Sequence, residues 1–283
     1  MVTGGVASFL DLTQETVRRF LQTVVIMDDE ATYDVDKITR YAAPSLLNAP
    51  GRVGESANEA NTLEKPLVRT NLNELDAQVI VDAFADQGLV CAVIKPFSGE
   101  GNTIKERITC AAQRADILVL DWDVNGTKGE TACEVIKALV TDVNKDRLRL
   151  IAIYTAEPGS AAIIEVIRAA LQLNEAGALD DQYTINYYSC RIVVYAKNGV
   201  GGGEREVPEG SLPNRLLRDF ASMTTGLLSN VTLLSLAAVR DNTHRMLTKF
   251  TPELDAPFLT HRALTTQPND ADVQLIPLVI MDP

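Results

Sequence analysis

Residues 115–126 read ADILVLDWDVNG, and this stretch contains the pattern that decides the fold. Its apolar run, Ile117–Leu120, is closed abruptly by Asp121 and Asp123, and Asn125-Gly126 is a turn signal. Short apolar runs closed by acidic residues are typical of strands buried in a parallel sheet. We therefore expect a buried strand that ends at Asp121.

The same pattern recurs on both sides of this strand. Residues 24–31 (VVIMDDEA), 150–158 (LIAIYTAEP) and 191–199 (RIVVYAKNG) each contain an apolar run that ends in polar residues. Helical patterns separate these runs, and the alternation of strands and helices predicts an α/β fold with a doubly wound parallel sheet. Such sheets bind ligands at the carboxyl ends of their strands, so the residues there are candidates for a functional site.

The chain of 283 residues has the length of one large domain or of one domain with an appendage. Residues 31–70 lack a clean period and are rich in Asn, Pro, Gly and Ala, so we interpret them as an insertion after the first strand. A helix then runs to about Ala85, with Asn71 or Asn73 as the N-cap. The predicted divisions are a helical lead-in (1–21), the α/β domain (22–225) and a helical or irregular C-terminal extension (226–283).

The composition limits the partners and the compartment. There are 26 basic and 38 acidic residues, a net charge of −12 that disfavours nucleic acid and membrane surfaces as partners. The N-terminus shows no secretory signal. The four cysteines form no CxxC pair, which is typical of free thiols in a reducing cytoplasm. These are Cys91, Cys110, Cys133 and Cys190.

Five side chains at the predicted strand ends make a coherent chemical set. The carboxylates of Asp28, Asp29 and Asp121 would repel one another unless a cation lay between them, and oxygen ligands suit a hard ion such as Mg²⁺. The hydroxyl of Thr155 and the ammonium of Lys197 would hold an anion, and phosphoryl oxygens fit. One carboxylate is then left to act as the nucleophile in aspartyl-phosphate formation.

These residues, in this order, resemble the receiver domain of two-component response regulators. VVIMDDEA is similar to the first strand of that family with its acidic pair, and ADILVLDWDVNG to the third strand with its phosphoacceptor. LIAIYTAEP is similar to the fourth strand with its Thr-Ala pair, and RIVVYAKNG to the fifth with its lysine. The resemblance covers about residues 22–225 and implies a flavodoxin-like fold with five parallel strands.

The resemblance also implies a role for each residue of the set. Asp121 is expected to be the phosphoacceptor. Thr155 and Lys197 are expected to grip the phosphoryl group, helped by the backbone N–H groups of Trp122 and Ala156. The expected Mg²⁺ ligands are Asp29 directly, Asp28 through water, Asp121, and the backbone carbonyl of Asp123.

Two kinds of partner follow from the same resemblance. A sensor histidine kinase would donate the phosphoryl group, and an effector, fused or separate, would respond to it. Enlarged receivers of this kind are similar to those in bacterial phage-defence operons of the Detocs type, which implies a role in antiviral defence. The apolar run LIPLVIMDP (275–283) leads us to expect that the chain continues into an effector domain.

The chain departs from the family pattern at three places. Asp29 and Asp121 are 92 residues apart, roughly twice the usual spacing, and the surplus falls in the insertion. Asn198 follows the lysine where the family has proline. Val194 occupies the position of the aromatic switch residue, with Tyr195 one place off. These departures concern the output of the switch more than its phosphorylation chemistry.

Two other functions fit parts of the pattern. A degenerate receiver would act only as a protein-interaction module. The string LDWDVNGT (120–127) also resembles the nucleophile motif of haloacid-dehalogenase-like phosphatases, with Asp121 as nucleophile and Asp123 as general acid. Those enzymes place their metal-binding acidic pair after the lysine. Here the pair Asp28-Asp29 comes before all the other candidate site residues, so we favour the receiver.

An apolar seam runs from the end of the predicted domain into the C-terminal extension. Its members recur at alternating spacings of three and four residues, which is typical of a helix seam. They are Leu217, Phe220, Thr224, Leu227, Val231, Leu234 and Ala238. The seam either packs on its own domain or forms a homodimer through residues 217–238. Gly226 argues against one uninterrupted helix.

Overall fold

The structure, a computed structural model, describes residues 9–33, 74–96, 102–140, 146–157, 160–172, 179–248 and 252–264. The chain divides into two compact units. The larger unit is Leu21–Met223. The smaller unit consists of two segments, Met1–Phe20 and Thr224–Pro283.

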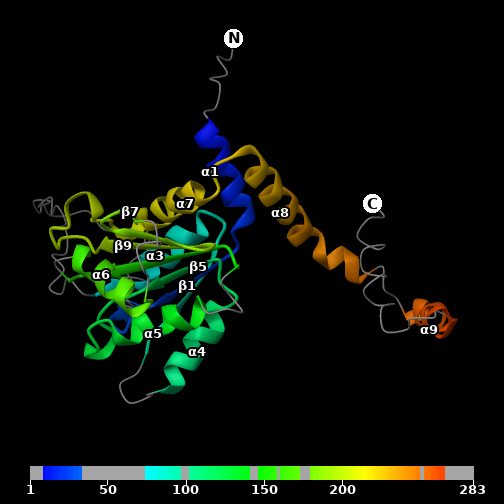
Figure 1. Ribbon diagram of the computed structural model, residues 1–283, viewed down its shortest axis with the longest axis horizontal. Helices are drawn as coiled ribbons and strands as arrows, with labels where there is room; N and C mark the ends of the chain where they lie inside the picture. Colours follow the sequence, from blue (N-terminus) through cyan, green and yellow to red (C-terminus); the bar gives the residue numbers. More distant parts are fainter. Residues whose placement is uncertain are drawn as a thin grey trace, which may run out of the picture. The chain divides into compact units, whose positions relative to one another are not determined.

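The larger unit is built on a seven-stranded sheet with the order β4-β1-β5-β6-β9-β8-β7 (Figure 1). The strands are β1 (Thr23–Met27), β4 (Val90–Ile94), β5 (Ile117–Leu120), β6 (Arg149–Thr155), β7 (Leu179–Asp181), β8 (Thr184–Tyr187) and β9 (Cys190–Ala196). From β4 to β9 the strands are parallel, which confirms the predicted doubly wound sheet of five parallel strands. β8 and β7 add an antiparallel pair at the β9 edge, beyond the predicted five.

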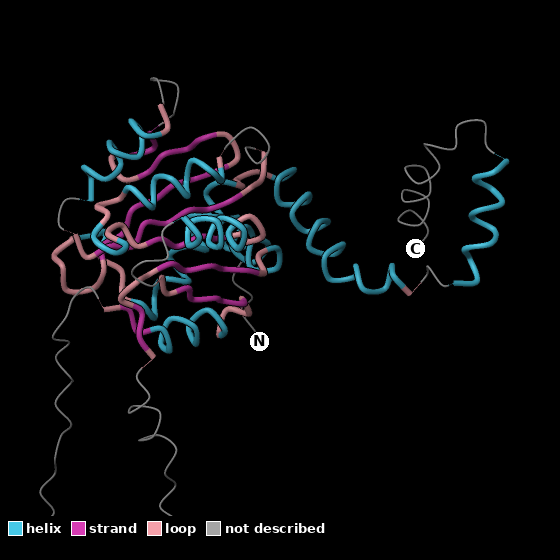
Figure 2. Tube along the Cα trace, turned by 90° about the horizontal axis from the view of Figure 1, so that it is seen from below, coloured by secondary structure: helices cyan, strands magenta, loops and turns pink. Residues whose placement is uncertain are grey.

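Helices cover both faces of this sheet, as Figure 2 shows. On one face lie α4 (Asn102–Ala112), α5 (Glu130–Leu139) and α6 (Ser160–Ala170), and on the other α3 (Ala77–Ala85) and α7 (Leu212–Met223). Every residue of β5 and β6 is buried, because helices exclude water from both sides. That is why these strands appear in the sequence as continuous apolar runs without alternation.

The helix α3 begins later than the sequence predicted. Asp76 is its N-cap, and the Asp76 carboxylate accepts a hydrogen bond of 3.1 Å from the Val79 N–H. The prediction of Asn71 or Asn73 as the cap is therefore wrong. Asp76 is the better cap here because its short carboxylate reaches the orphan N–H groups of the first turn while its own backbone stays extended.

A second, two-stranded sheet closes the ends of the insertion. β2 (Ala31–Thr32) pairs in parallel with β3 (Leu75–Asp76), and the Thr32 hydroxyl donates to Glu74 at 2.7 Å. Residues 34–70 of the predicted insertion lie outside the described residues. The described residues that flank positions 34–73 are therefore paired with each other directly after Asp28-Asp29.

The smaller unit contains α1 (Phe9–Phe20), α8 (Leu227–Leu247) and α9 (Asp255–Leu264). α1 and α8 run parallel, since Asn230 bonds Thr13 near the start of both and Arg240 bonds the Phe20 carbonyl further along. Between α7 and α8 the backbone of Gly226 has φ +136°, so the seam helix is interrupted there as predicted. None of the helices in the described part of the chain has the length and apolar character that crossing a membrane requires.

Candidate functional site

The carboxyl ends of four parallel strands meet at one edge of the sheet. Met27 of β1 pairs with Leu120 of β5, which pairs with Ile153 of β6. Thr155, the last residue of β6, pairs with Ala196, the last residue of β9. The residues at or directly after these ends are therefore neighbours in space, as the sequence predicted. They are Asp28, Asp121, Thr155 and Lys197.

Three carboxylates gather at this edge. Asp28, Asp29 and Asp121 each offer an oxygen atom, and these three atoms all lie within 4.8 Å of one another. Asp28 and Asp121 are buried, with 2% and 8% of their surface exposed, and Asp29 is half-buried. Oxygen-only donors at this spacing fit a hard divalent cation, and burial makes their mutual repulsion costly without one.

Burial sets the protonation of the two inner carboxyl groups. Removal from water raises the pKa of Asp121 to about 7, although the nearby Lys197 ammonium opposes the shift. Burial also raises the pKa of Asp28, against the attraction of the same ammonium. In the absence of a metal ion, Asp121 therefore takes up a proton near neutral pH, where an exposed aspartate would stay ionised.

Lys197 supplies the positive charge of the pocket. Its ammonium nitrogen lies 2.8 Å from Asp28 Oδ2 and 3.9 Å from Asp121 Oδ1, and its side chain is only 3% exposed. The sequence predicted that this lysine lies near the acidic residues but did not predict that Asp28 is its nearer partner. With one ammonium against three carboxylates, the pocket still favours a divalent cation.

Comparison with known families fits this geometry. Residues 20–201, more than half of the chain, match the family model of the response receiver domain. The chain belongs to the response receiver domain family. No curated protein and no solved structure matches it significantly. The family match agrees with the order of the site residues along the chain, in which the acidic pair Asp28-Asp29 comes first. It favours the receiver over the phosphatase, whose acidic pair would follow the lysine.

The loop after β5 of the receiver is organised by two of the acidic residues. Asp29 Oδ2 accepts a 2.8 Å hydrogen bond from the Asn125 N–H, so this carboxylate of the three-acid cluster also fixes the loop. Asp123 Oδ1 accepts a 2.7 Å bond from the Lys128 N–H, which turns this carboxylate toward its own loop. Asn125 and Lys128 both have positive φ, and these bonds help to hold that backbone shape.

Trp122 follows the predicted acceptor and is locked in place. Its N–H donates to Asp121 Oδ1 at 2.9 Å, so the backbone group expected to grip a phosphoryl group here orients the carboxylate. The indole ring lies against Gly129, where an added Cβ would come within 2.1 Å of the ring. The sequence contained no signal for this contact, because it joins Trp122 to the N-cap residue of α5 across the loop.

Gly129→Ala is expected to lower the free energy of unfolding by about 2–4 kcal/mol, through a left-handed backbone at φ +86° and a clash with Trp122. Gly126→Ala is the matched control, since Gly126 also has positive φ but an added Cβ meets nothing within 4 Å. Gly126→Ala should lower the free energy of unfolding by about 1 kcal/mol. Urea unfolding followed by Trp122 fluorescence measures both, and equal losses would contradict the packing argument.

Thr155 and Lys197 are joined through the backbone. The Lys197 N–H donates to the Thr155 carbonyl at 2.8 Å, continuing the β6–β9 ladder to the edge of the site. The Thr155 side chain is buried, and its hydroxyl oxygen accepts a 3.0 Å bond from the Glu157 N–H. Ala156 is half-buried and lies between Thr155 and Glu157 in this turn.

The two candidates for a switch residue lie on opposite faces of the sheet. Val194 belongs to the core cluster with α4, α5 and α6. Tyr195 points to the other face, where its hydroxyl accepts a 3.3 Å hydrogen bond from Arg215 of α7 and the Arg215 guanidinium lies 5.4 Å from its ring. A shift of one residue reverses the face in a strand, so Tyr195 does not replace an aromatic residue at position 194.

The glycine-rich loop after Lys197 is held by a residue that the sequence analysis missed. The Glu206 carboxylate accepts hydrogen bonds from the N–H groups of Gly199 at 2.7 Å and Gly201 at 3.1 Å. The Val207 N–H donates to the Ala196 carbonyl, which ties the far end of the loop to β9. The loop is therefore a structured connection that steadies the strand end carrying Lys197.

Proposed function

We propose that this receiver is phosphorylated on Asp121 by a histidine kinase and that the acyl phosphate switches an effector. The observation that supports the proposal best is the buried cluster of Asp28, Asp29 and Asp121 with Lys197 beside it. A purely structural edge of a sheet has no need to bury Asp28 and Asp121 beside a third carboxylate, because each buried carboxylate costs several kcal/mol of lost hydration.

The transfer is a substitution at phosphorus. An oxygen of the Asp121 carboxylate attacks the phosphorus of a phosphohistidine, a P–O bond forms, and the P–N bond breaks. The imidazole nitrogen leaves with the electron pair and is then protonated. Bound Mg²⁺ would offset the charge of the carboxylates and of the phosphoryl oxygens, and Asp28, Asp29, Asp121 and the Asp123 carbonyl would hold it.

The chain's own groups orient the acceptor and then hold the product. The Trp122 N–H fixes Asp121 Oδ1 before the reaction, which leaves the other carboxylate oxygen as the nucleophile. Lys197, already 3.9 Å from Asp121, exchanges its contact with Asp28 for a phosphoryl oxygen. The Thr155 hydroxyl and the Ala156 N–H bind the remaining oxygens.

The signal to the effector follows from the movement of Thr155 and Lys197 when they bind the phosphoryl group. Thr155 and Lys197 are joined by a backbone bond, so drawing either side chain toward the phosphoryl group shifts the ends of β6 and β9 together. α6 packs against β9, and α7 contacts β6 from the other side. We propose that an effector reads this shift. Antiviral defence and a cytoplasmic location remain predictions from the sequence.

Intact mass spectrometry after incubation with Mg²⁺ and acetyl phosphate tests the proposal. Wild type is expected to gain one phosphoryl group, and EDTA or Asp121→Asn should abolish the gain. Asp123→Asn is the matched control, since that side chain bonds its own loop and asparagine can accept the same bond. A gain that persists in Asp121→Asn would overturn the assignment. No gain in wild type would support an interaction-only receiver.

A further inference from the structure

The outward surface of α8 is unusually apolar. Residues 227–239 (LLSNVTLLSLAAV) contain no charged residue over thirteen positions. Most of the large apolar side chains in this run are exposed, Leu228 by 81%. The exposed ones are Leu227, Leu228, Val231, Leu234, Leu236 and Val239. A helix that faced water here would carry charged and polar groups on this surface.

The inward surface of the same helix pair is partly polar. Thr13 and Asn230 are buried between α1 and α8, and the Asn230 amide donates to the Thr13 hydroxyl at 3.1 Å. Leu233 and Ala237 are the buried apolar residues of α8. Over residues 227–239, α8 thus buries only Leu233, Ala237 and the polar Asn230, and it leaves its other large apolar side chains exposed. The outward surface therefore has the composition of a second buried face.

Four outward residues form a stripe. Leu227, Val231, Leu234 and Ala238 follow one another at spacings of four, three and four residues, which places them along one side of the helix. They are the second half of the predicted seam. The first half (Leu217, Phe220 and Thr224) is buried and cannot contribute to a docking surface. The usable stripe is therefore confined to α8, on the C-terminal side of Gly226.

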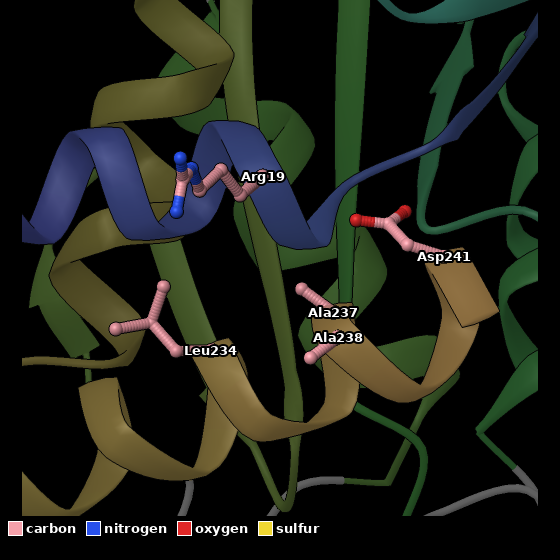
Figure 3. A pocket seen from close by; sticks show the side chains of 5 residues that line it. All are labelled: Arg19, Leu234, Ala237, Ala238 and Asp241. Carbon is pink, nitrogen blue, oxygen red and sulfur yellow. The ribbon is translucent and has the colours of Figure 1, made fainter.

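A groove of about 270 Å³ lies beside the stripe, between α1 and α8 (Figure 3). Leu234, Ala237 and Ala238 line its floor, and Arg19 of α1 and Asp241 of α8 stand on its two sides. The rim thus carries one charge of each sign. Two copies related by a two-fold axis can bring these opposite charges together, whereas a rim of one sign would repel its own copy.

We infer that the α8 stripe and this groove bind the same surface of a second copy of this chain, forming a two-fold homodimer. A closed dimer interface uses one patch on both subunits, so the patch must complement itself. The stripe meets this condition, because the 4-3-4 spacing lets side chains of one α8 enter the gaps of another. Together, two α1–α8 pairs would make a four-helix layer that covers the exposed leucines.

Sedimentation velocity of the full chain over a micromolar concentration series tests the inference. The monomer mass is 30.8 kDa, and wild type is expected to sediment with twice that mass and to dissociate on dilution. Val231→Glu places a charge in the stripe at an exposed position, so it should weaken the dimer roughly 100-fold or more. Thr243→Glu is the control, because Thr243 is exposed on the same helix beyond the uncharged run.

Far-UV circular dichroism of both variants should match wild type, since neither side chain is buried. A wild type that stays monomeric throughout the series would overturn the inference, and so would a Val231→Glu variant that dimerises as strongly as Thr243→Glu. The measurement needs neither Mg²⁺ nor a phosphodonor, so its outcome is independent of whether Asp121 is phosphorylated.

Discussion

Lys197→Met is expected to lower the free energy of unfolding of the metal-free protein by about 3 kcal/mol at neutral pH. Methionine keeps the length of the side chain but removes the ammonium that lies 2.8 Å from Asp28 Oδ2. Removing one partner of a buried ion pair leaves the other charge uncompensated, a loss of typically 3–5 kcal/mol. Burial already raises the pKa of Asp28, so this carboxylate can take up a proton when the ammonium is removed. Proton uptake limits the loss to the lower end of that range.

Urea unfolding in EDTA measures this effect. Lys95→Met is the matched control, because Lys95 follows β4 at the same edge, is exposed, and donates to the Ala31 carbonyl. We expect its loss to stay below about 1 kcal/mol. Added Mg²⁺ should recover part of the loss in Lys197→Met, since a cation replaces the missing charge. Equal losses in both variants, or no recovery with Mg²⁺, would contradict the electrostatic account of the pocket.

Asp121→Asn is expected to raise the free energy of unfolding of the metal-free protein at pH 8, by an amount on the order of 2 kcal/mol. Burial raises the pKa of Asp121 to about 7 in the folded protein, from about 3.8 in the unfolded chain. The folded state therefore holds this proton more tightly. As the pH rises from about 4 to about 7, the free energy of unfolding of wild type falls.

Asparagine does not titrate, so the variant should lose this dependence. Urea unfolding at pH 5 and pH 8 in EDTA is expected to show a larger gain for Asp121→Asn at pH 8 than at pH 5. Asp123→Asn, which neutralises a half-buried carboxylate outside the three-acid cluster, should change little at either pH. An Asp121→Asn variant with the same pH profile as wild type would show that the carboxylate carries no burial penalty.

The sequence predicted the edge of the sheet well because apolar runs and their polar ends are local signals. Asp28, Asp121, Thr155 and Lys197 lie where the pattern placed them, since each directly follows or ends a buried parallel strand. The fold class follows from the same alternation of strands and helices, and the family match confirms it.

Features that depend on contacts between distant segments could not be predicted. The choice of Asp28 over Asp121 as the nearer partner of Lys197 is decided by side-chain geometry across the sheet. The role of Glu206 leaves no signal in the sequence, because its partners are backbone N–H groups of a glycine-rich loop. Asp76 was overlooked as a cap because the strand that positions it, β3, pairs with β2 across the whole insertion.

The face of an aromatic residue was predictable in principle. Side chains alternate along a strand, so Tyr195 must lie opposite Val194 once the register of β9 is fixed. The antiparallel pair β7–β8, which the family pattern of five strands does not contain, adds to the sheet at the β9 edge. We therefore expect the output of this receiver to differ from the pattern of its family, while its acceptor chemistry stays the same.

The most direct test of the central claim is to identify the phosphorylated residue. After incubation with Mg²⁺ and acetyl phosphate, borohydride reduces an aspartyl phosphate to homoserine, and peptide mass spectrometry then locates it. The account predicts homoserine at position 121, dependent on Mg²⁺, with unmodified aspartate at positions 28, 29 and 123. Homoserine at any of those three positions, or none after a metal-dependent gain of a phosphoryl group, would contradict it.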